Sequence, residues 1–138
     1  MKNKSLISLS FLLMIGFLAR VFAHGENEIG PHGGFIQMPG AWHTELVLDQ
    51  NQKNAKIYLL DIEFKNPTVK NSKLTLTLKK PGRDNEQLIQ CVAKQVFYVC
   101  SLSKIKLKKG DQLKVLAERD GKMGGIVTYS FPLKKVTH

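Results

Sequence analysis

The chain has 138 residues, of which 43% are hydrophobic, and its 21 lysines and arginines outnumber 11 acidic residues to give a net charge of +10. This length allows one domain with one hydrophobic core. The sequence lacks the combined basic and aromatic face typical of nucleic-acid binding, and its lysines are scattered as on solvated strand surfaces.

The first 23 residues have the features of a signal peptide. A basic start, "MKNK", precedes the apolar stretch "SLISLSFLLMIGFLA", and "VFA" places Val21 and Ala23 at the two positions that a signal peptidase inspects. We predict cleavage after Ala23, with an uncleaved N-terminal anchor as the alternative. The protein is then expected in the periplasm or outside the cell, and its basic mature form is not expected to span the membrane.

Residues 24–34 are polar and contain glycine and proline, so they are predicted to form a flexible lead-in. Residues 35–138 are predicted to form a single domain. From residue 35 onward, the apolar residues recur with period two, which is typical of strands. The clearest strand-like runs are "TELVLD", "KIYLLDIEF", "KLTLTLK", "LIQCV", "VFYVCSL", "QLKVLAE" and "GIVTYSFPL".

Turn signals such as "DQNQKN", "KKPGRDN" and "RDGKMGG" separate these runs. The pattern predicts an all-β domain, an immunoglobulin-like or fibronectin-like β-sandwich of about seven to nine strands. The residues that alternation assigns to its core are Leu46, Leu48, Leu74, Leu76, Leu78 and Phe131.

Cys91 and Cys100 are the only cysteines, and both lie in strand-like runs. An even cysteine count in an exported chain favours a disulfide. A thiolate pair for a soft metal is the alternative, but such pairs are usually spaced more closely. We therefore predict a Cys91–Cys100 disulfide.

Three of the four histidines, His24, His32 and His43, fall within 20 residues of one another. In "WHTELVL", Trp42, Thr44 and Leu46 share the face that is expected to be core. His43 and Glu45 project together from the opposite face, because side chains alternate along a strand. The Glu45 carboxylate can then bind the same ion as His43, or it can accept a hydrogen bond from the His43 ring and so orient that ring.

His32 lies in "GPHGG", where Gly33 and Gly34 are expected to turn the backbone. If cleavage follows Ala23, His24 becomes the mature N-terminus, and its amine and imidazole can chelate one cation. Imidazole and amine nitrogens suit copper, nickel and zinc, and the Irving–Williams order favours copper. We predict a transition-metal site at His24, His32 and His43, with Glu45 or Met38 as a further ligand. The alternative interpretation is that each of these residues, taken singly, is an ordinary turn or surface residue and not a metal ligand.

"GPHGG" followed by "HTELVL" and "KIYLLDIEF" resembles a segment of the periplasmic adaptor proteins of heavy-metal efflux systems, and of related short periplasmic proteins. The resemblance covers roughly residues 30–64. It implies a periplasmic β domain linked with copper or metal handling, with His32 as the matching histidine, and a metal-efflux component as a partner. The chain lacks the coiled-coil hairpin and the lipoyl-like halves of an adaptor, so an accessory metal carrier is the role that the resemblance implies.

The sequence carries no glycine-flanked nucleophilic serine, no phosphate-binding loop and no H-E-x-x-H motif, so we do not predict an enzyme. Two other hypotheses stay open. The first is an immunoglobulin-like domain that binds another envelope protein. The second is a basic domain that binds an anionic envelope polymer through its positive charge.

Overall fold

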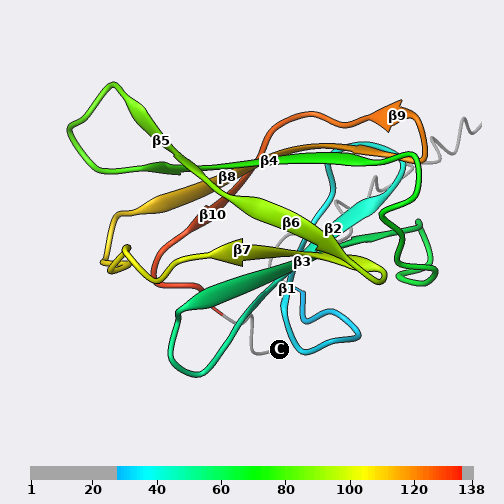
Figure 1. Ribbon diagram of the computed structural model, residues 1–138, viewed down its shortest axis with the longest axis horizontal. Coiled ribbons are helices and arrows are strands. Elements are labelled where there is room, and N and C mark those ends of the chain that lie inside the picture. The colour runs from blue at the N-terminus through cyan, green and yellow to red at the C-terminus, as the bar shows by residue number, and fades with distance from the viewer. Residues whose placement is uncertain (1–27, 135–138) are drawn as a thin grey trace, which may run out of the picture.

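The computed structural model describes residues 28–134, and within this range ten strands form two antiparallel sheets (Figure 1). The predicted signal peptide and His24 lie outside the described residues. The all-β prediction is confirmed, and the strand count exceeds the expected range by one because the two-residue β9 is included. The described residues include no helix of the length and apolarity needed to cross a membrane.

The first sheet has the strand order β1-β2-β3-β7-β6 and the second has the order β10-β8-β4-β5, with β9 also paired to β8. The strands of the first sheet are β1 (Phe35–Gln37), β2 (His43–Leu48), β3 (Asn54–Leu60), β7 (Phe97–Ser101) and β6 (Cys91–Lys94). Those of the second are β10 (Val127–Ser130), β8 (Gln112–Arg119), β4 (Lys73–Lys79), β5 (Glu86–Ile89) and β9 (Lys122–Met123).

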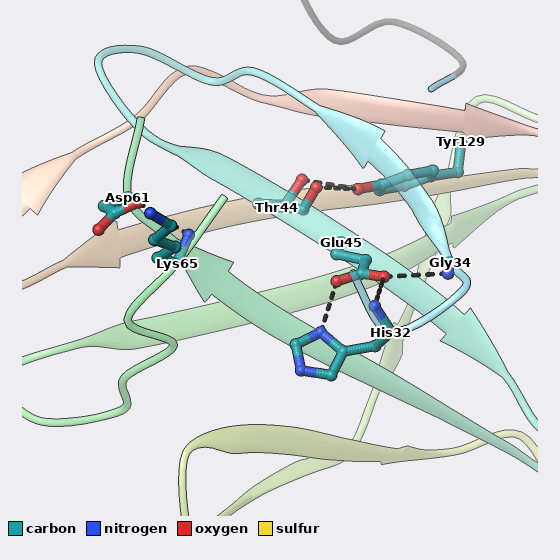
Figure 2. A network of polar contacts seen from close by, with 7 residues as sticks. All are labelled: His32, Gly34, Thr44, Glu45, Asp61, Lys65 and Tyr129. Atoms are coloured by element: carbon teal, nitrogen blue, oxygen red, sulfur yellow. Dashed lines mark hydrogen bonds and ion pairs between the residues drawn. The ribbon is translucent and has the colours of Figure 1, made fainter. Parts of the chain in front are cut away.

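The main core lies between the two sheets and contains the residues predicted by alternation. Leu46, Leu76 and Leu78 are fully buried there, and the remaining predicted core residues, Leu48, Leu74 and Phe131, are partly buried against it. Trp42 and Thr44 also point inward, as expected from the period of β2. The Thr44 hydroxyl is 2.6 Å from the Tyr129 hydroxyl, which ties β2 to β10 of the other sheet (Figure 2). Burial raises the pKa of Tyr129, so its phenol stays protonated.

The predicted disulfide is present and joins two neighbouring strands. Cys91 of β6 lies directly opposite Cys100 of β7, and Cys100 is fully buried in the main core. Closing a loop of about ten residues stabilises the fold by roughly 2.5–3 kcal/mol on the chain-entropy model. The bond holds the edge strand β6 to the first sheet.

A second, smaller apolar cluster covers the outer face of the first sheet. The pairing places Ile36, Glu45 and Tyr58 side by side across β1, β2 and β3, and Phe97 of β7 follows Tyr58. The cluster consists of Ile36, Tyr58 and Leu60, with Val47, Phe64 and Phe97 packed against them. The candidate site lies on this outer face, which these apolar side chains partly shield from solvent.

Candidate functional site

The turn formed by "GPHGG" wraps around the carboxylate of Glu45. Glu45 projects from β2 onto the outer face and is completely buried. Its Oε1 accepts the backbone N–H of His32 at 2.8 Å and that of Gly34 at 3.0 Å (Figure 2). The turn closes on itself through the Gly30 N–H, which donates to the Gly34 carbonyl at 2.8 Å. A buried carboxylate thus satisfies the donors of the turn that covers it.

Three positions in this turn require glycine, each for a different steric reason. A Cβ at Gly30 would lie 2.4 Å from Cδ of Glu45, and a Cβ at Gly34 would lie 2.4 Å from the Leu46 carbonyl oxygen. Gly33 has a φ of +78°, a left-handed conformation that other residues rarely adopt. The predicted need for glycine at positions 33 and 34 is therefore confirmed, and Gly30 is equally required.

The imidazole of His32 is held in one orientation by two contacts. Its Nδ1 lies 2.7 Å from Oε2 of Glu45, and its ring stacks on Tyr58 with ring centres 3.7 Å apart and planes inclined by 4°. We assign the proton to Nδ1, because a carboxylate offers only acceptors. Nε2 is then left with a free lone pair in the neutral ring. The His32 side chain is 34% exposed, so a ligand can reach it.

His43 shows the same chemical pattern at a buried position. Its Nδ1 lies 3.0 Å from the backbone carbonyl oxygen of Asp61, which can only accept, so Nδ1 is again the protonated nitrogen. Its Nε2 is buried and has no hydrogen-bond partner among the described residues. The ring stacks on Phe64 at 4.3 Å and the residue is 1% exposed. A buried nitrogen lone pair without a donor is unusual in a folded protein.

Residues 61–66 form a tight loop that holds Phe64 over His43. The Asp61 carboxylate accepts the backbone N–H groups of Lys65 at 2.8 Å and Glu63 at 2.9 Å, and the side-chain amide of Asn66 at 2.7 Å. These hydrogen bonds, led by that from Lys65, lower the pKa of Asp61. The Arg119 guanidinium secures the loop by donating to the Asn66 carbonyl at 2.7 Å.

The structure places His43 and Glu45 on one face of β2, as predicted, but gives Glu45 a different partner. Its carboxylate holds the ring of His32, not that of His43. Met38, just beyond β1, is 40% exposed and makes no side-chain hydrogen bond among the described residues. Within residues 28–134, no three histidine, cysteine, aspartate or glutamate side chains lie close enough together to hold a metal ion.

Two parts of the site escaped the sequence analysis. Tyr58 stacks beneath His32, and Phe64 covers His43. Alternation in "KIYLLDIEF" does place Tyr58 on the face opposite Ile57, so its side could have been read from the sequence. Phe64 has a positive φ of 62°, and no sequence signal marks an aromatic residue for that conformation.

The chain matches no protein-family model, no curated protein sequence and no solved structure.

Proposed function

We propose that this protein is a small exported metal-binding domain of the cell envelope, that copper is its preferred ion, and that His32 is the anchoring ligand. The observation that carries the proposal is the Glu45–His32 pair. A histidine that ligates a metal usually donates its other ring N–H to a carboxylate or a carbonyl, which fixes the tautomer and raises the basicity of the ligating nitrogen. Here the 2.7 Å contact at Nδ1 leaves Nε2 available on a partly exposed ring.

His43 gives a second nitrogen of the same kind. Its Nδ1 is held by a backbone carbonyl, and its unpartnered Nε2 belongs to a residue only two positions from Glu45 on the same strand face. Two positions along a strand correspond to about 7 Å. Because Phe64 covers the ring, His43 is accessible to an ion only when the 61–66 loop moves.

The N-terminal segment supplies the rest of the proposed site. His24 lies four positions before Glu28, the first described residue. Four residues of extended chain reach at most about 14 Å, so His24 can lie up to that distance from Glu28. After cleavage at Ala23, the amine and ring of His24 offer two more nitrogens to an ion bound at His32. A site of three or four nitrogens favours Cu(II) over zinc or nickel. The resemblance to efflux adaptors suggests a metal-efflux component as the partner.

Copper titration of the mature protein tests this function. Trp42 is the only tryptophan, is buried and directly precedes His43, so its fluorescence is a convenient reporter beside calorimetry. We expect Cu(II) to bind with a Kd tighter than about 10 μM at pH 7. Binding should weaken as the pH is lowered, because nitrogen ligands bind a metal only in their deprotonated form, and it should tolerate moderate salt.

Single substitutions then locate the site. His32→Ala and Glu45→Gln should each weaken Cu(II) binding by about 10- to 100-fold, since ring-orienting partners matter nearly as much as ligands. His138→Ala is the matched control and should leave the Kd unchanged. Thermal unfolding of each variant separates loss of the site from loss of the fold. If wild type binds more weakly than about 10 μM, or if His24→Ala, His32→Ala and His43→Ala all bind like wild type, the histidines are incidental and the interaction-domain hypothesis takes precedence.

A further inference from the structure

The two ends of the sandwich differ in charge. The connections 49–53, 80–85 and 102–111 and the segment 131–134 all lie at one end. Pairing places residues 79, 112 and 130 together in the second sheet and residues 54 and 101 together in the first, and one hollow is lined by Gln52, Leu107 and Phe131 from both. They contain eight basic and three acidic residues, a net charge of +5. The connections 38–42, 61–72, 95–96 and 120–126 at the opposite end contain three of each sign. The first of these ends is called the basic end below, and the second is called the neutral end.

A hollow of about 410 Å³ at the basic end is lined by four cationic side chains, Lys80, Arg83, Lys108 and Lys109, with Pro81 and Asp111. Asp111 is 1% exposed and organises this hollow. Its Oδ2 accepts the Lys80 ammonium at 2.6 Å and the Lys108 backbone N–H at 2.8 Å. Burial raises the pKa of Asp111, but these two hydrogen bonds together with the positive charges of Lys80 and Lys108 outweigh burial and lower the pKa overall.

Asp111 also fixes the segment after β10. Its carbonyl accepts the Phe131 N–H at 2.9 Å, and the Gly110 N–H donates to the Phe131 carbonyl at 2.9 Å. Three separate segments of the basic end therefore meet at Asp111, two through its carboxylate and one through its backbone carbonyl. The lysines stand on a fixed scaffold, which reduces the entropy that a ligand must overcome.

Most of the positive charge in the hollow is not neutralised by the protein. Of its four cationic side chains, only Lys80 has a carboxylate partner within the described residues. The side chains of Arg83, Lys108 and Lys109 are exposed. An anion with more than one negative charge would complement them.

Apolar surface adjoins this charge. A second hollow, of about 460 Å³, is shared by Lys109 and Lys134 with Phe35, Phe131 and Leu133. A third, of about 320 Å³, has Lys108 and Lys109 beside Leu107 and Leu133. Lys109 borders all three hollows. Charge beside hydrocarbon-lined hollows suits a ligand that carries an anionic group next to an apolar chain, which describes a lipid better than a polysaccharide.

We propose that the basic end docks on an anionic lipid surface, with Arg83, Lys108 and Lys109 on the phosphate headgroups and the neighbouring apolar hollows facing the upper part of the acyl chains. Each basic residue near an anionic leaflet is worth roughly fivefold in affinity at moderate ionic strength. The cationic residues of this surface, Arg83, Lys108 and Lys109, take no part in the His32 site. It gives the domain a fixed orientation at a membrane, with the neutral end directed away from the lipid.

Vesicle flotation with the disulfide-bonded mature protein tests the proposal. A chelator keeps the protein metal-free, so that the outcome is independent of the copper site. Vesicles of phosphatidylglycerol and phosphatidylcholine in equal parts should carry the protein at about 0.1 M salt and release it at about 1 M, where the Debye length falls from about 10 Å to 3 Å. Vesicles of phosphatidylcholine alone should not carry it.

A matched pair of double variants assigns the surface. Lys108→Glu with Lys109→Glu should weaken vesicle binding at least about tenfold. Lys70→Glu with Lys122→Glu changes the net charge equally at exposed positions of the neutral end and should weaken it less than about threefold. Equal losses in both variants would show that only net charge matters, and would overturn the proposal. So would binding to dextran sulfate without binding to vesicles, which would identify an anionic polymer as the partner.

Discussion

Replacing Glu45 by alanine is expected to destabilise the fold by about 2–5 kcal/mol, because it removes a buried side chain together with the hydrogen bonds that it accepts. The carboxylate is fully buried and accepts three hydrogen bonds, from His32 N–H, His32 Nδ1 and Gly34 N–H. Its loss leaves the buried Gly34 donor without a partner and opens a void beneath the turn. Urea unfolding followed by circular dichroism measures the change.

One further variant separates the charge of the Glu45 carboxylate from its shape, and a second serves as a control at an exposed glutamate. Glu45→Gln keeps an oxygen for the two backbone donors but presents a donor to His32 Nδ1, so a loss of about 1–2 kcal/mol is expected. Glu63→Ala removes an exposed glutamate whose one ion pair among residues 28–134, with Lys65, spans 3.8 Å, and it should change stability by less than about 0.5 kcal/mol. A Glu45→Ala protein within about 1 kcal/mol of wild type would contradict the structural role assigned to this carboxylate.

Leu76→Ala is expected to cost about 2–5 kcal/mol, because a fully buried leucine leaves both lost transfer energy and a cavity. Leu76 lies at the middle of β4, paired to β8 on one side and β5 on the other, and its side chain is completely buried in the main core. Equilibrium unfolding in urea gives the difference in free energy.

Leu88→Ala on the adjacent β5 is the matched control. Leu88 pairs with Thr77 of β4 but is 66% exposed, so its truncation should stay within about 0.5 kcal/mol of wild type. If Leu76→Ala changed stability by less than about 0.5 kcal/mol, or if wild type gave a helical circular-dichroism spectrum, the strand assignment itself would be wrong.

The sandwich was predictable because apolar and polar residues alternate in several of its strands, most clearly in β4 and β8. "KLTLTLK" directs Leu76 and Leu78 to one face, and the structure buries both. The disulfide was predicted from the even cysteine count together with the expectation of an exported chain. The route of the chain was not: only Gln90 separates β5 from β6, yet β5 belongs to the second sheet and β6 to the first (Figure 1). Such a change of sheet depends on twist and packing, which no local pattern encodes.

On the outer face of β2, the sequence analysis singled out His32, His43 and Glu45 but missed Tyr58 and Phe64, and it predicted their arrangement only in part. The period of β2 correctly placed His43 and Glu45 on the face opposite Trp42. The pairing of Glu45 with His32 depends on Gly30 and Gly34 approaching β2 closely, a tertiary contact that follows from the fold as a whole. The cover over His43 depends on Phe64 in a left-handed conformation, which the Asp61 turn imposes against the residue's own preference.

Electron spin-echo envelope modulation of the Cu(II)-loaded mature protein tests most directly whether Nε2 of His32 ligates copper. An imidazole bound through Nε2 leaves its remote Nδ1 to modulate the echo, and in His32 that nitrogen is hydrogen-bonded to Glu45. Wild type should show remote-nitrogen modulation. His32→Ala, loaded with one equivalent of copper, should lose the contribution of one imidazole, and Glu45→Gln should shift its nitrogen quadrupole frequencies. Identical spectra for wild type and His32→Ala would contradict the proposed role of His32.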